Sequence, residues 1–144
     1  MSTSQKSRRS RRPKITLSTT TLSELESLSE GMMRRNPELA DRLIEEIGRA
    51  RIVAPDRLQA DIVDLGRMFS YRDETAGEDH TGTLVLPQHA DISSGRISVM
   101  TPIGVALIGL AEDAAFYWET LDGQRRELKI LKVFPSETAE PRVT

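Results

Sequence analysis

The sequence predicts an α+β protein. A short antiparallel helical hairpin of the coiled-coil kind should precede an antiparallel β-sheet domain with one short helix. Two patterns support this prediction. Between residues 22 and 50, apolar side chains recur every three or four positions, as on one face of a helix. From Ala54 onward, short β-prone runs alternate with turns rich in Gly, Pro and Asp.

Composition and length indicate one main domain with small appendages in a chain of 144 residues. The expected segments are a basic tail (1–14), a helical hairpin (15–53), the β-sheet domain (54–136) and a polar tail (137–144). The chain has no cysteine, which excludes a disulfide framework, and it has no apolar stretch long enough for a transmembrane helix. We therefore expect a cytoplasmic protein without membrane contacts, and we expect a monomer.

The helical hairpin is predicted from its caps and apolar stripes. The run Ile15–Ser18 indicates a short edge strand, and the capping box Thr21–Glu24 indicates the start of the first helix. Asn36 and Pro37 suit the cap and first position of the second helix. The apolar stripes are Leu22, Leu25, Leu28 and Met32, then Ala40, Leu43, Ile44, Ile47 and Ala50. Because the turn is short, the helices should pair as a projecting finger.

Four β-prone runs predict the sheet. They are residues 63–71, interrupted at Gly66, then 83–86, 115–119 and 128–134. The apolar phase of the last run slips between Ile130 and Leu131, which indicates a β-bulge or burial on both faces. Asp122-Gly123 suits a two-residue hairpin turn. The acidic segment 73–79 predicts a solvated loop, with loose divalent-cation binding as the alternative.

A central stretch, Ile97–Gly109, predicts a strand end, a turn and a buried helix in succession. Thr101 suits a helix N-cap, and Pro102 suits the first helical position. Residues 103–108 are apolar almost all round, so this short helix should fill the concave face of the sheet. Gly109 should end the helix in a left-handed turn.

Side chains that could carry catalysis form no recognisable motif. The chain contains many serines and two histidines, but no nucleophile elbow, P-loop or dinucleotide-binding glycine motif. The run Phe116-Tyr117-Trp118 could stack nucleic-acid bases, although alternation favours core packing for Phe116 and Trp118 with Tyr117 on the opposite face. We expect no enzymatic activity, no cofactor and no bound metal.

The charge of the chain is unevenly distributed. Residues 1–14 carry six basic residues and no acidic one, whereas the remainder has a net charge of −8. Such a tail is either a solvated, disordered segment or a DNA- or RNA-binding arm. The candidate nucleic-acid contacts are Arg8, Arg9, Arg11 and Arg12.

The central stretch also contains a motif of defined order and spacing: Ile97-Ser98-Val99, then Pro102-Ile103, then Leu107-Ile108-Gly109. With Glu112-Asp113 and the following hairpin, residues 61–134 resemble the C-terminal domain of the bacterial Gre transcript-cleavage factors. This resemblance implies an FKBP-like domain that docks on RNA polymerase at the rim of its secondary channel. The docking loop that the resemblance implies is Met100, Thr101, Pro102 and Ile103.

The N-terminal half departs from the Gre pattern. In that family a long coiled coil enters the channel, and paired acids at its tip help to hold the catalytic magnesium. Here the finger is short, and its tip residues are Met32, Met33, Arg34, Arg35, Glu38 and Asp41. Two arginines oppose the delivery of carboxylates to magnesium. The short finger and the Ala54–Pro55 junction are similar to the Rnk family, the regulators of nucleoside diphosphate kinase, which are Gre relatives with a truncated coiled coil.

This resemblance implies a non-enzymatic regulator of transcription elongation. Such a protein binds RNA polymerase, lacks transcript-cleavage stimulation and competes with other secondary-channel factors. Two alternatives stay open. One is an active Gre-type cleavage factor in which Glu38 and Asp41 supply the metal-binding acids. The other is an FKBP-like prolyl isomerase, which needs an open pocket lined by aromatic side chains.

Overall fold

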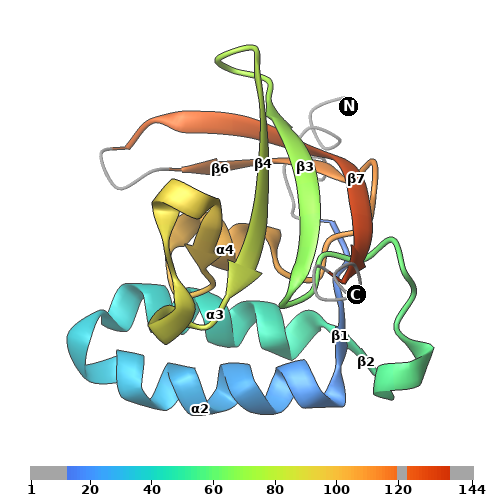
Figure 1. The fold of residues 1–144 in the computed structure, drawn as a ribbon. Coiled ribbons are helices and arrows are strands. Elements are labelled where there is room, and N and C mark those ends of the chain that lie inside the picture. Colours follow the sequence, from blue (N-terminus) through green and yellow to red (C-terminus); the bar gives the residue numbers. More distant parts are fainter. Residues whose placement is uncertain (1–12, 120–122, 137–144) are drawn as a thin grey trace, which may run out of the picture.

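After a short strand, two helices occupy the N-terminal part of the chain and a strongly curved sheet follows them (Figure 1), which confirms the α+β class. This computed structural model describes residues 13–119 and 123–136. The helices and strands are β1 (Thr16–Ser18), α2 (Thr19–Arg35), α3 (Pro37–Arg49), β2 (Arg51–Val53), β3 (Arg67–Asp73), β4 (Glu78–Val85), β5 (Arg96–Ser98), α4 (Pro102–Leu107), β6 (Ala115–Glu119) and β7 (Arg125–Ser136). Single 3-10 turns are η1 (Pro55–Arg57), η2 (Pro87–His89) and η3 (Ile92–Ser94).

Helix α2 begins earlier than predicted. Its N-cap is Ser18, whose hydroxyl accepts the backbone N–H of Thr21 at 3.1 Å. The predicted capping box at Thr21–Glu24 is therefore wrong. The reason is that Ser18 also ends β1, so the chain passes directly from strand to helix and leaves Thr21 buried inside the first turn.

The turn between α2 and α3 follows the prediction. The side chain of Asn36 accepts the N–H of Leu39 at 3.2 Å, and Pro37 occupies the first turn of α3. The N–H of Asn36 donates in turn to the carbonyl of Met32 at 2.8 Å. One residue thus caps both helices, which lie side by side in Figure 1.

The helical pair is packed against the sheet domain, so the prediction of a projecting finger is wrong. Helix α3 lies between α2 and α4 (Figure 1) and contacts α4. Its buried residues are Leu39, Ala40, Leu43 and Glu46. Ile44, which was expected in the apolar stripe, is 42% exposed. The stripe is rotated because α3 has two neighbours, α2 and the sheet domain, and Leu39 takes a place in the core.

Five strands form the main sheet in the order β5-β4-β3-β7-β6. All pairs are antiparallel except β4 with β5, which is parallel. The prediction of a fully antiparallel sheet is therefore wrong at this edge, because residues 86–95 carry the chain back to the level of Thr83 before β5 begins beside the last three residues of β4. A second, two-stranded parallel sheet joins β1 to β2, which confirms the predicted N-terminal edge strand.

The predicted irregularity in the last strand is a β-bulge. Ser70 pairs with Lys132 and Tyr71 pairs with Ile130, which leaves Leu131 as the extra residue. Other strand limits differ from prediction. β4 begins at Glu78, inside the segment expected to be an acidic loop, and β3 begins only at Arg67. The predicted turn residue Asp122 lies outside the described residues, whereas Gly123 has the positive φ of 87° that the turn needs.

Helix α4 fills the concave face of the sheet, as predicted. The hydroxyl of Thr101 accepts the N–H of Gly104 at 3.1 Å and donates to the carbonyl of Ser98 at 2.8 Å. Gly109 follows the helix with φ 86°, and its carbonyl accepts the N–H of Thr16 in β1 at 3.0 Å. A single core joins both halves of the chain and includes Leu17, Leu25, Leu43, Phe69, Leu84, Val105, Leu107, Leu128 and Ile130.

Gly104 sets the distance between α4 and the end of β5. A Cβ atom at this position would lie 2.5 Å from the carbonyl oxygen of Ser98 and 2.8 Å from the Cα of Val99. We predict that Gly104→Ala lowers the free energy of unfolding by about 2–3 kcal/mol, because backbone atoms must move apart. Urea denaturation followed by circular dichroism measures this change.

Gly31 provides the matched control. It lies in α2 with open space around its Cα, so Gly31→Ala should stabilise the protein by about 0.5–1 kcal/mol. Equal effects of the two substitutions would contradict the close packing of α4 on β5.

Candidate functional site

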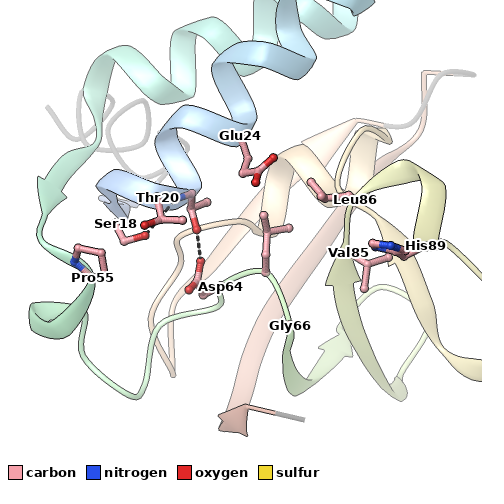
Figure 2. Close-up of a pocket in the computed structure, with 11 residues that line it drawn as sticks. Ser18, Thr20, Glu24, Pro55, Asp64, Gly66, Val85, Leu86 and His89 are labelled. Carbon is pink, nitrogen blue, oxygen red and sulfur yellow. Dashed lines mark hydrogen bonds between the residues drawn. The ribbon is translucent and has the colours of Figure 1, made fainter. Parts of the chain in front are cut away.

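A hollow of about 480 Å³ lies where the start of α2 meets the sheet domain (Figure 2). Its lining residues come from four regions of the chain and are Ser18, Thr20, Thr21, Glu24, Pro55, Asp64, Leu65, Gly66, Val85, Leu86 and His89. Its volume is in the range of small-molecule pockets. The sequence offered no signal for it, because its walls are brought together only by the packing of α2 on the segment before β3.

One hydrogen bond connects the two walls of the hollow. The hydroxyl of Thr21 donates to Oδ1 of Asp64 at 2.6 Å, drawn as the dashed line in Figure 2. Glu24 supplies the second carboxylate of the lining, while Val85 and Leu86 supply an apolar wall. Two carboxylates beside an apolar wall suit a hydrogen-bond donor or a cationic side chain with an aliphatic stem. The lining residues include no aromatic side chain of the kind that a prolyl isomerase pocket needs.

The acidic residues between β3 and β4 make structural contacts. Asp73 is buried, pairs with Arg126, and accepts the N–H groups of Thr75 and Ala76 at 3.0 and 3.1 Å. Burial acts to raise the pKa of Asp73, but these hydrogen bonds outweigh it and hold the pKa below its ordinary value. Asp79 pairs with Arg72 at 2.7 Å. Among residues 13–119 and 123–136, no group of three or more potential ligands converges on a metal position.

The predicted docking loop is less exposed than expected. Met100 is only 7% exposed and belongs to the core, so this residue cannot serve as an exposed docking contact. Thr101, Pro102 and Ile103 are half-buried. The loop is rigid because the side chain of Ser98 accepts the N–H of Met100 at 3.0 Å, while Thr101 caps α4. Its accessible part is therefore Thr101–Ile103.

The predicted finger-tip residues surround the turn at Asn36. Met33, Arg34 and Arg35 are exposed in the last turn of α2, where basic side chains interact favourably with the helix dipole. Glu38 and Asp41 are exposed at the start of α3. Met32 instead packs against the core. The predicted nucleic-acid contacts Arg8, Arg9, Arg11 and Arg12 lie outside the described residues.

The sequence indicated one further surface only in part, through Tyr117. The guanidinium of Arg125 lies 4.3 Å from the centre of the Tyr117 ring, and Nζ of Lys132 lies 5.7 Å from that of Phe134. The alternation of β6, which placed Tyr117 opposite its neighbours, was the available signal. The basic partners of the two rings follow from the packing of side chains in the folded sheet, which the sequence alone does not give.

Comparisons with known proteins agree with this architecture. A family model described as transcription elongation factor, GreA/GreB, C-term matches residues 58–135, and a model described as Rnk N-terminus matches residues 13–53. A regulator of nucleoside diphosphate kinase from Escherichia coli (strain K12) is 30% identical over 122 residues, which cover 85% of this chain and 90% of that protein. The chain belongs to the Rnk family.

Members of the GreA/GreB group are also similar to this Rnk-family chain. A transcription elongation factor GreA from Azorhizobium caulinodans is 35% identical over 102 residues, which cover 71% of this chain and 60% of that protein. A solved structure of a prokaryotic transcription elongation factor GreA/GreB from Nitrosomonas europaea superimposes with a TM-score of 0.68 at 31% identity and covers 85% of this chain and 99% of that chain. The fold is thus GreA/GreB-like. None of the helices described here is long and apolar enough to span a bilayer.

The hydrogen bond between Thr21 and Asp64 fastens α2 to the sheet domain. We predict that Thr21→Val lowers the free energy of unfolding by about 1.5–3 kcal/mol, because it removes a donor to a charged acceptor. Thermal and urea unfolding measure the loss. Thr20→Val is the matched control, since Thr20 is the exposed neighbour in the same hollow and should change stability by less than about 0.5 kcal/mol. Equal losses in both variants would contradict the role of this bond.

Proposed function

We propose that this Rnk-family protein binds RNA polymerase and regulates transcription elongation without stimulating transcript cleavage. A role in transcription elongation is supported by two findings. The chain belongs to the Rnk family, and its second half matches the GreA/GreB model. In this proposal the protein acts as a cytoplasmic monomer at the rim of the secondary channel and competes there with Gre factors. Its sheet domain is FKBP-like, with α4 occupying the concave face where an isomerase would need an open pocket.

The arrangement of the helical pair is the main support for the absence of transcript-cleavage stimulation in this proposal. Metal-assisted cleavage requires carboxylates to be delivered at the metal with near-octahedral geometry. Here α3 is packed between α2 and α4, so the helical pair is fixed on the protein's own sheet domain. Arg34 and Arg35 are exposed at the tip of the pair beside Glu38. A factor with this arrangement can occupy a binding site on RNA polymerase without supplying carboxylates to the catalytic metal.

The loop before α4 is the proposed docking edge. Thr101, Pro102 and Ile103 are half-exposed, and their backbone is held by the cap of α4 and by Ser98. A rigid loop with accessible apolar groups loses little conformational entropy on binding. Polymerase binding through this loop leaves the tip of the helices and the outer face of the sheet free for other contacts.

Pro102→Glu tests the docking edge together with the cleavage activity. An acidic residue is tolerated in the first turn of a helix, so stability should change by less than about 1 kcal/mol. We predict at least a tenfold loss of affinity for purified bacterial core RNA polymerase, measured by biolayer interferometry. The wild-type protein should bind, yet it should not accelerate transcript cleavage in stalled elongation complexes supplied with magnesium.

Ile92→Glu is the matched control, because Ile92 is a 79% exposed apolar residue on a different loop. It should bind polymerase as the wild type does. Unchanged binding of Pro102→Glu would overturn the docking edge. Faster cleavage that is lost in the variant Glu38→Gln/Asp41→Asn would instead establish the protein as an active cleavage factor.

A further inference from the structure

The outer face of the five-stranded sheet is open. In Figure 1, α3 and α4 lie on the concave side, and none of the labelled elements covers the other side. Strand pairing places Arg72 opposite Lys129, and Ser70 opposite Lys132. The side chains between them along β3 and β7 point into the core, where Tyr71 and Ile130 are buried. The register of the strands therefore identifies which residues lie on the outer face of the sheet.

Basic side chains outnumber acidic ones on this face. The described side chains that carry charge there are Arg72, Arg96, Arg125, Lys129 and Lys132, against Asp79 and Glu127. Asp79 is already paired with Arg72. No ion pair joins Lys129 or Lys132 to any carboxylate among the side chains that the structure describes. The surplus is notable because residues 15–144 carry a net charge of −8.

Two aromatic rings accompany these cations. Tyr117 is 42% exposed beneath the guanidinium of Arg125, and Phe134 is half-exposed beside the ammonium of Lys132. Surface aromatic rings on a sheet offer flat faces on which bases can stack, and neighbouring cations neutralise phosphates. Packing in the apolar core does not explain either aromatic ring, since both rings lie on the solvent side of their strands.

We propose that this outer face, Tyr117, Arg125, Lys129, Lys132 and Phe134, binds single-stranded nucleic acid. The bases stack on the two rings while the cations contact the phosphates. An acidic protein would match the charge but would make no use of the exposed rings, and a duplex hides the faces of its bases. This inference is independent of the proposed polymerase contact and concerns the isolated protein.

Fluorescence anisotropy with a labelled 12-nucleotide oligouridylate tests the proposal. The background is the full-length chain and, in parallel, a chain that lacks residues 2–12, so that the basic tail is counted separately. In both backgrounds, Lys129→Gln/Lys132→Gln should weaken binding and reduce the slope of log affinity against log salt concentration by about 1.4, the value expected for two lost phosphate contacts on a single strand. Tyr117→Leu should weaken binding roughly fivefold or more with an unchanged salt slope, because it removes only stacking.

Arg51→Gln/Arg57→Gln is the matched control, since both residues are exposed and lie before β3, outside the five-stranded sheet. It should leave the salt slope within 0.5 of wild type, as roughly expected for charges that contact no phosphate. Wild-type affinity and slope in the lysine variant would overturn the proposal. Equal losses in the lysine and arginine variants, or no effect of Tyr117→Leu, would also overturn it, because binding would then reflect net charge alone.

Discussion

The packing of α3 against α4 is the constraint on which the rest of the structure depends. Leu43 is fully buried on α3, and Leu107 is fully buried on α4, in one core that continues to the sheet. Burying a leucine side chain contributes about 2 kcal/mol to the free energy of unfolding. A helical pair that left this core would expose several apolar side chains and lose that stabilisation for each of them. The hydrogen bonds of Thr16 to Gly109 and of Thr21 to Asp64 fasten the same junction from the side of β1 and α2.

This junction decides which surfaces are available for function. It fixes the helical pair, which bears the arginines at its tip, on the sheet domain, and it places α4 in the concave face of the sheet. The accessible features are then the loop at Thr101–Ile103, the hollow beside Asp64 and the outer face of the sheet.

Local signals in the sequence predicted local structure well. Asn36-Pro37, Thr101-Pro102 and the phase slip at Leu131 each act within a few residues, and the structure confirms all three. Features that depend on tertiary packing were not predictable in this way. Ser18, not Thr21, caps α2 because β1 ends at Ser18. Ile44 is exposed because α3 packs against two neighbours. The parallel pairing of β5 with β4 depends on the path of residues 86–95. For the candidate sites, the sequence located the tip and the loop, but burial of Met100 and the hollow beside Asp64 arose from packing.

A distance measurement between the helical tip and the sheet domain tests the central claim most directly. The chain has no cysteine, so spin labels at Arg35→Cys and Ile92→Cys, both exposed positions, are unique. Double electron–electron resonance should give a single narrow distance distribution, matching the separation in the structure, if the helical pair is packed on the sheet domain through α4. A broad distribution extending to longer distances would show a finger that projects and moves independently, and would contradict the account.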